Sequence, residues 1–174
     1  MIIVDYKTYY DAQHGIRKDL PWNEAAAMFA VPKAYAPFGI CPTTDEKSDD
    51  YKSWKAEVDK LKKQTGYVFW GDTKDGRKAK TDIIDHSAIC LDYDGVKDGD
   101  RFLEHVEKVL EHTNYLYYST TKSTQDLLRL RIVIPLEKPA IGDEYQALAR
   151  QFIKIVGTEG IDKTSIEDNR AMGY

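Results

Sequence analysis

From Ser87 to the C-terminus, segments of two different periodicities follow one another in a readable order. Strand-like segments occur at residues 88–94, 115–119 and 128–135, and segments with apolar side chains at helical spacing occur at residues 98–112 and 142–157. Asp98 or Asp100 is the expected N-cap of the first helix, and Gly157 the expected end of the second. A last short strand is expected near Ile161 or close to the C-terminus. This β-α-β-β-α-β order predicts an α/β (α+β) fold of the ferredoxin-like kind.

The first half of the chain has weaker signals. Residues 50–66 predict an amphipathic helix that carries Tyr51, Trp54, Val58 and Leu61 on one stripe, and residues 67–70 a short strand. Residues 34–50 combine prolines with a polar, acidic run and are the least regular part. The connection at residues 71–82 is polar and rich in turn residues.

The strand at residues 88–94 ends in two aspartates one residue apart, within the stretch AICLDYDG. Side chains alternate along a strand, so Asp92 and Asp94 point to one side and Tyr93 to the other. Two neighbouring carboxylates repel each other unless a positive group lies between them. A hard divalent cation such as Mg²⁺ or Mn²⁺ suits oxygen ligands of this kind. The stretch therefore predicts a metal site, and a solvated strand end leading into an Asp-Gly turn is the alternative.

Basic side chains are expected beside the aspartates. In LRLRIVIP, alternation puts Arg129 and Arg131 on one face of the strand and the leucines and isoleucines on the other. Guanidinium groups on the open face that carries the aspartates are suited to phosphate contacts, whereas solvated arginines on a plain sheet face are the alternative. A second, looser phosphate-contacting patch, or simply a solvated loop, is expected at Lys74, Arg77, Lys78 and Lys80.

Composition limits the classes of function. With 174 residues, of which 42% are hydrophobic and 31% charged, the chain has the profile of a soluble globular domain. No apolar run approaches the roughly 20 residues that span a bilayer, and no signal-peptide pattern opens the chain, so we expect a cytoplasmic protein without membrane contact. Cys41 and Cys90 lack metal-ligand spacing and are expected to be reduced thiols. A net charge of −4 excludes nucleic-acid binding through bulk charge and requires a local basic surface instead.

Three blocks carry a family resemblance: RKAKTDIIDHSAICLDYDG, YLYYSTTKSTQDLLRLRIVIPLEKPAIGDEYQALARQF and GIDKTSIEDNRAMGY. Together they resemble the primase–polymerases of the archaeo-eukaryotic primase superfamily, above all the N-terminal domains of phage and mobile-element replication proteins. The resemblance covers residues 66–174. It implies an RRM-like catalytic module at residues 86–174, packed on an N-terminal α/β unit at residues 1–85. The implied activity is that of a DNA primase or polymerase, a metal-dependent, template-directed nucleotidyltransferase of DNA replication.

The resemblance also implies residue roles. Asp92 and Asp94 match the family's first motif, D-x-D, and Asp162 in GIDKTS is the best match to its third, a lone acidic residue on a later strand. These three carboxylates are implied to be the catalytic residues and to hold Mg²⁺ or Mn²⁺ ions, which bind the phosphates of the incoming nucleotide and activate the primer 3′-hydroxyl. Implied partners are nucleoside triphosphates, a single-stranded or primed DNA template, and a helicase domain or helicase protein.

The second motif of the family, Ser-x-His, is altered in this chain. Ser119 matches, but Thr121 stands where the histidine is expected, and Lys122 beside it carries the charge that threonine lacks. The expected contacts to nucleotide or DNA are accordingly Ser119, Thr121, Lys122, Arg129 and Arg131.

Two alternatives remain open at this stage. A primase-like domain with weakened activity would bind nucleic acid or a replication partner, and the missing histidine supports it. A haloacid-dehalogenase-type phosphatase would use the same Asp92 and Asp94 as a D-x-D-G motif, but it requires parallel strands.

Overall fold

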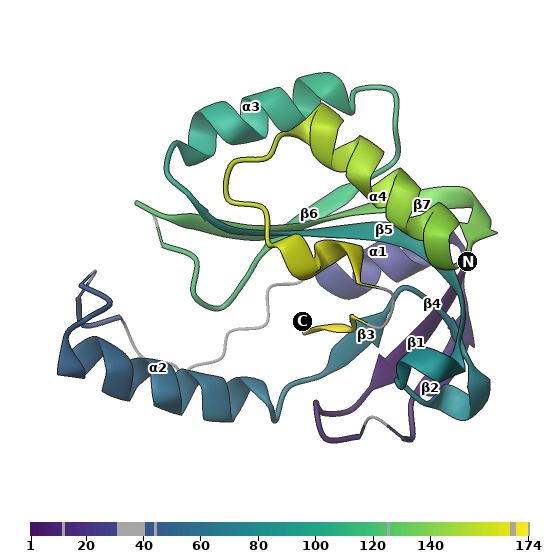
Figure 1. Cartoon of the computed structure of the whole chain (residues 1–174), viewed down its shortest axis with the longest axis horizontal. Coiled ribbons are helices and arrows are strands. Elements are labelled where there is room, and N and C mark those ends of the chain that lie inside the picture. Colours follow the sequence, from purple (N-terminus) through teal and green to yellow (C-terminus); the bar gives the residue numbers. More distant parts are fainter. Residues whose placement is uncertain (12, 31–40, 44, 125, 168–169, 174) are drawn as a thin grey trace.

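The computed structural model of the chain describes residues 1–11, 13–30, 41–43, 45–124, 126–167 and 170–173, and the structural statements below concern these residues. Two antiparallel sheets of four strands each organise the fold (Figure 1). The larger one has the order β4-β5-β7-β6, with bounds β4 (Gly71–Thr73), β5 (Ile83–Val96), β7 (Leu128–Ala140) and β6 (Leu116–Ser119).

Two helices, α3 (Gly99–Val109) and α4 (Gly142–Val156), cover one face of this larger sheet (Figure 1). Asp98 caps the start of α3 by accepting a hydrogen bond from the Arg101 backbone N–H, and Gly157 ends α4, both as predicted. The main core lies between these helices and the sheet. Its buried strand residues include Ile89, Leu91, Tyr93, Leu130, Ile132 and Ile134.

The fold class predicted from the sequence is confirmed, with one change at its last strand. The order β5-α3-β6-β7-α4 is that of a ferredoxin-like module, and β5 and β7 pair in its centre. In the described part of the chain, two segments share the place of a last strand beside β5. β4 pairs with the first half of β5, and an isolated bridge joins Tyr93 to Ile161. The sheet is antiparallel throughout its described strands, so it lacks the parallel pairing that the phosphatase alternative requires.

The smaller sheet has the order β2-β1-β3-β8. Its strands are β2 (Ile16–Asp19), β1 (Ile2–Tyr6), β3 (Tyr67–Phe69) and β8 (Met172–Gly173). A second core joins this sheet and α1 (Trp22–Ala30) to the other face of the larger sheet, through Val68, Trp70, Cys90, Val133 and Met172. Strand pairing connects the two units predicted on either side of residues 85 and 86: β4 pairs with β5, and β8 pairs with β3.

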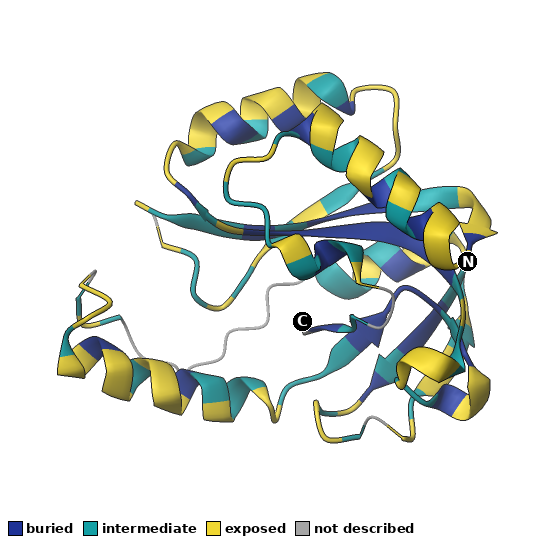
Figure 2. Cartoon of the chain, viewed as in Figure 1, coloured by how far each residue is buried: buried dark blue, intermediate teal, exposed yellow. Residues whose placement is uncertain are grey.

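Helix α2 (Asp49–Lys62) extends away from both sheets, on the side of the larger sheet opposite α3 and α4 (Figure 1). Its N-cap is Ser48, whose hydroxyl accepts from the Tyr51 N–H. Only Tyr51 and Val58 of the predicted stripe are buried, and exposed residues occur along its length (Figure 2). Of the segment predicted as least regular, residues 34–50, residues 34–40 and 44 lie outside the described residues.

Short 3₁₀ turns complete the structure: η2 (Lys74–Gly76), η3 (Lys80–Asp82) and η4 (Lys163–Ile166). Cys41 and Cys90 are free thiols, as expected, and burial raises the pKa of Cys90 to about 12. Among the helices described, none has the length and apolar character needed to cross a membrane.

Candidate nucleotidyl-transfer site

The central strand pair sets opposite charges against each other. In the register of β5 and β7, Asp92 lies opposite Arg131 and Asp94 opposite Arg129. Because Leu91 and Tyr93 point into the core under α3 and α4, the two aspartates point to the other face. The arginines predicted to share that face do so. Two rows of opposite charge therefore run side by side on the face that α3 and α4 leave uncovered.

Asp162 joins this face from the segment that follows α4. Its backbone N–H donates to the Asp92 carbonyl oxygen at 2.8 Å, and the Asp92 N–H donates to the Ser165 hydroxyl at 2.9 Å. The Asp162 carboxylate also caps η4, where it accepts from the N–H and the hydroxyl of Thr164 at 2.9 and 2.8 Å. Backbone pairing thus holds Asp162 beside the end of β5.

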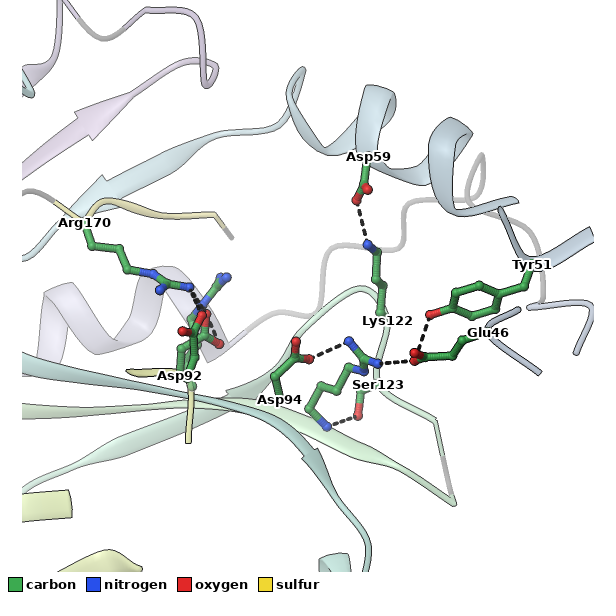
Figure 3. Close-up of polar contacts among 11 residues, drawn as sticks. Glu46, Tyr51, Asp59, Asp92, Asp94, Lys122, Ser123 and Arg170 are labelled. Carbon is green, nitrogen blue, oxygen red and sulfur yellow. Dashed lines mark hydrogen bonds and ion pairs between the residues drawn. The ribbon is translucent and has the colours of Figure 1, made fainter. Parts of the chain in front are cut away.

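Arg170 connects the two carboxylates. One guanidinium nitrogen, Nη2, lies 2.8 Å from an oxygen of Asp92 and 2.7 Å from an oxygen of Asp162 (Figure 3 shows the contact with Asp92). Nε of Arg131 lies 3.4 Å from the other Asp92 oxygen. Neighbouring carboxylates require a positive group between them, and here arginine side chains supply it.

The electrostatics of this cluster favour the charged forms. Burial acts to raise the pKa of Asp162, but the hydrogen bonds from Thr164 and Arg170 outweigh it, so that the pKa lies below its usual range. Burial also acts against the charge of Arg131, whereas Tyr118 and Asp92 raise its pKa, which ends above the ordinary value. The Asp162 carboxylate and the Arg131 guanidinium are therefore stabilised in their charged forms by neighbouring groups of the cluster.

Asp94 has a different set of contacts, closer to solvent. Its carboxylate accepts from Arg129 at 2.5 Å, and the second guanidinium nitrogen of Arg129 lies 3.4 Å from Glu46. The Tyr51 hydroxyl of α2 donates to the same Glu46 at 3.3 Å (Figure 3). The Asp94 side chain is 57% exposed, against 11% for Asp92. Asp94 is thus the accessible carboxylate of the pair.

The turn between β6 and β7 carries the altered second motif. Lys122 reaches α2, where its ammonium donates to Asp59 at 2.6 Å, and Ser123 accepts from the Arg129 N–H at 3.0 Å (Figure 3). Thr121 is exposed in the turn. Ser119 lies opposite Leu130, on the face that the helices cover, because its neighbour Tyr118 lies opposite Arg131. Thr121 and Lys122 therefore lie in the turn after β6, whereas the side chain of Ser119 lies on the face of the sheet opposite to Asp92 and Asp94.

Lys62 adds a further positive charge. It lies one turn after Asp59 on α2, so its side chain shares the face that Lys122 contacts. Burial lowers the pKa of the Lys62 ammonium, and the charges of Lys122 and Arg131 lower it further. Within the described part of the chain, this ammonium has no hydrogen bond or ion pair. An anion bound here would relieve the repulsion between three neighbouring cations.

The carboxylates are also candidate ligands of a metal ion. Among the residues described, no group of three or more His, Cys, Asp or Glu side chains is close enough to hold one. Asp92 and Asp162 nevertheless direct one oxygen each to a single positively charged nitrogen, which is the arrangement of two ligands of a hard cation. Asp94 is bound to Arg129 instead. Two of the three predicted ligands therefore converge, and these two fit a divalent cation chemically.

Three participants could not be identified from the sequence. Arg170 follows Asp162 by eight residues without any periodic signal, and its position depends on the pairing of β8 with β3. Glu46 and Asp59 are charged residues in a polar run and on an exposed helix, where nothing distinguishes them from solvated neighbours.

Comparison with known proteins assigns the chain to a family. The model of the VapE N-terminal domain matches residues 12–174. The chain belongs to the VapE N-terminal domain family. This membership agrees with the recognition of a primase-like domain of phages and mobile elements from the sequence motifs.

Among solved structures, this VapE N-terminal domain is similar to the AEP domain of the primase–polymerase (PrimPol) of cyanophage S-2L. The two share 12% sequence identity with a TM-score of 0.48, over 99% of this chain and 70% of the phage chain. At these values no residue role passes from one protein to the other. The curated proteins contain no match to this chain.

Proposed function

We propose that this domain is a DNA primase–polymerase that catalyses metal-dependent, template-directed nucleotidyl transfer in the replication of a phage or mobile element. The observation that carries the proposal is the convergence of Asp92 and Asp162 on one cationic position, beside a row of arginines. Family membership and the order of the sequence motifs support it.

Asp92 and Asp162 would hold the catalytic cation, Mg²⁺ or Mn²⁺, with Asp94 as the third ligand. Such an ion neutralises phosphate charge and lowers the pKa of an attacking hydroxyl. Asp94 becomes available when Arg129 takes another anionic partner, and a triphosphate is a suitable one because guanidinium binds phosphate oxygens in pairs.

The basic residues would bind the triphosphate. Arg129 borders the acidic pair at the accessible end, and Lys122 and Lys62 approach from the turn and from α2. Arg131 is buried against Asp92 and Tyr118, so it fixes the position of Asp92 and also contributes to the stability of the sheet. Thr121 would contribute a hydrogen bond from its exposed turn, without the charge that a histidine offers.

The test is an assay of primer extension and de novo synthesis on single-stranded templates, with Mg²⁺ or Mn²⁺ and with ribo- or deoxynucleotides. The wild-type domain should incorporate nucleotides, and Asp92→Asn should abolish incorporation. Asp100→Asn is the matched control because Asp100 is exposed on α3, on the far side of the sheet. Incorporation by Asp92→Asn at the wild-type rate would disprove the assigned role of Asp92.

One observation favours a second candidate. Each of the three aspartates is already paired with an arginine: Asp92 with Arg131 and Arg170, Asp162 with Arg170, and Asp94 with Arg129. A domain that binds nucleic acid or a replication partner without catalysis could use such a neutralised cluster as a structural element. Inertness of the wild type and of Thr121→His under every primer, template and metal condition would favour this candidate.

A further inference from the structure

Three tyrosines and one lysine gather where β1 ends and β3 begins. The rings of Tyr9 and Tyr67 contact edge to face with centroids 5.4 Å apart, and those of Tyr9 and Tyr10 do so at 5.9 Å. The ammonium of Lys78 lies over the Tyr9 ring at 4.4 Å and within 5.7 Å of the Tyr67 ring. We call Tyr9, Tyr10, Tyr67 and Lys78 the tyrosine cluster.

The segment that presents the cluster is fixed by hydrogen bonds. The Tyr9 N–H donates to the carbonyl oxygen of Lys63, which follows α2, at 3.1 Å. The Thr8 hydroxyl donates to Asp11 at 3.2 Å and accepts from the Tyr10 N–H at 3.2 Å. The tyrosines are held in position and yet remain in solvent, with Tyr9 45% and Tyr10 68% exposed. Large rings held in this way are not explained by the packing of a core.

Positively charged side chains lie next to the cluster. Burial lowers the pKa of Lys78, and in the described part of the chain its ammonium makes no ion pair with a carboxylate. Its contacts there are with the ring faces. Lys62 and Lys63 end α2 next to the turn that holds Tyr9. Cations next to exposed aromatic rings suit a ligand that combines flat bases with phosphates.

The cluster is continuous with the acidic site. Tyr67 lies within electrostatic reach of Arg131 and Asp59, and Lys62 lies within reach of Lys122 and Asp92. Tyr67 of the cluster and Lys62 beside it are therefore close enough to the acidic site to be influenced by its charges.

We propose that the tyrosine cluster is a binding platform for single-stranded DNA, on which unpaired bases stack against Tyr9 and Tyr10 while Lys78 contacts the backbone. The proposal rests on the proposed function for the identity of the ligand as template DNA. Duplex DNA does not fit this platform, because its bases are stacked on one another and offer no free faces.

The test measures binding of a fluorescently labelled oligothymidine and of a matching duplex by fluorescence anisotropy, over a series of salt concentrations. Replacing Tyr9 and Tyr10 together with alanine should weaken oligothymidine binding by at least about 5- to 150-fold, the range for loss of a single stacked base. Replacing both with phenylalanine should preserve binding, because the ring faces remain. Lys78→Gln should lower the slope of log affinity against log salt by about one.

Tyr117→Ala is the matched control, since Tyr117 is 41% exposed on β6. It should bind oligothymidine like the wild type. The proposal is overturned if the double alanine variant binds like the wild type, if the phenylalanine variant is as weak as the alanine variant, or if duplex binding falls equally. Circular dichroism and thermal unfolding establish that each variant is folded.

The outcomes also separate this proposal from the proposed function. If nucleotide incorporation is observed, and neither incorporation nor oligothymidine binding depends on Tyr9 and Tyr10, the platform is wrong and the enzyme assignment stands. If oligothymidine binding depends on the tyrosines while no incorporation occurs under any condition, the platform stands and the enzyme assignment fails.

Discussion

Replacing Arg170 with glutamine should destabilise the fold, because the guanidinium offsets the repulsion between the carboxylates of Asp92 and Asp162. The guanidinium of Arg170 contacts both Asp92 and Asp162, at 2.8 and 2.7 Å. Glutamine keeps a hydrogen-bonding side chain but removes the charge. The two carboxylates would then face each other, with Arg131 as the remaining ion-pair partner described for Asp92.

The size of the effect follows from the exposure of the three side chains. Breaking a buried pair from one side costs about 3–5 kcal/mol, whereas exposed pairs contribute about 0–1 kcal/mol. Asp92 is 11% exposed, Arg170 24% and Asp162 31%, so the pair lies between these limits. We expect a loss of about 2 kcal/mol in the free energy of unfolding, or a fall in Tm of about 4–8 °C for a domain of this size.

Thermal unfolding of the wild type and the variant, with and without Mn²⁺, measures this effect. If Asp92 and Asp162 are the ligands of a divalent cation, Mn²⁺ should raise the Tm of Arg170→Gln more than that of the wild type, because the ion no longer competes with the guanidinium. Arg150→Gln is the matched control, since Arg150 is exposed on α4 and contacts Gln146. An unchanged Tm in Arg170→Gln, or an equal response of all three proteins to Mn²⁺, would show that Arg170 does not offset repulsion between Asp92 and Asp162 at a cation site.

Three further predictions concern the nucleotide clamp and the charges around it. Thr121→His should tighten nucleotide binding by roughly 10- to 150-fold, the equivalent of a charge-assisted hydrogen bond of about 1.5–3 kcal/mol; no change in a calorimetric titration, together with loss of binding in Lys122→Ala, would assign the role to lysine. Lys62→Gln should stabilise the fold near neutral pH but weaken nucleotide binding. The pKa of Lys62 is lowered in the folded protein, so its charge destabilises the fold below that pKa, and stability rises as the pH rises toward the ordinary pKa of lysine. Urea unfolding that shows no gain in stability would contradict this. The lowered pKa of Asp162 stabilises the fold above the ordinary aspartate pKa, and this stabilisation is lost as the pH falls through the lowered value. Asp162→Asn should therefore flatten the pH dependence of urea unfolding in the acid range, and an unchanged acid profile would count against the contacts described for Asp162.

The sequence predicts those parts of the fold whose signal is local. Helices α3 and α4 and the centres of β5 and β7 carry apolar residues at their own period, and their predicted positions agree with the structure to within a few residues. The same alternation predicts that Asp92, Asp94, Arg129 and Arg131 share one face. These conclusions need no knowledge of distant contacts.

Other features depend on pairing between distant segments. Strand β5 begins at Ile83, well before the apolar run, because its first residues pair with β4 and with the end of β7. β4 comes from a connection expected to lack strands, and it has only three residues. Arg170 reaches Asp92 because the neighbouring β8 pairs with β3, about a hundred residues earlier in the chain. Such contacts leave no periodic trace in the sequence.

Burial also changes which variants are informative. The alternation on β7 suggests that Arg129 and Arg131 are equivalent phosphate ligands, but Arg131 is packed between Asp92 and Tyr118, whereas Arg129 lies at the accessible end. Removing Arg131 would therefore lower stability together with binding. Arg129→Ala is the cleaner probe of phosphate contact, since it removes an ion pair whose acidic partner is more than half exposed.

The claim that Asp92 and Asp162 form one cation site is tested by the binding of Mn²⁺ to the isolated domain. Binding is measured from the electron paramagnetic resonance signal of the free ion. We expect a site in the wild type that weakens at least tenfold in Asp162→Asn and in Asp92→Asn, because the loss of a ligand costs no less than the loss of a residue that supports one. Asp100→Asn should bind Mn²⁺ like the wild type. Equal binding of Mn²⁺ by all four proteins would contradict the claim that Asp92 and Asp162 form one cation site.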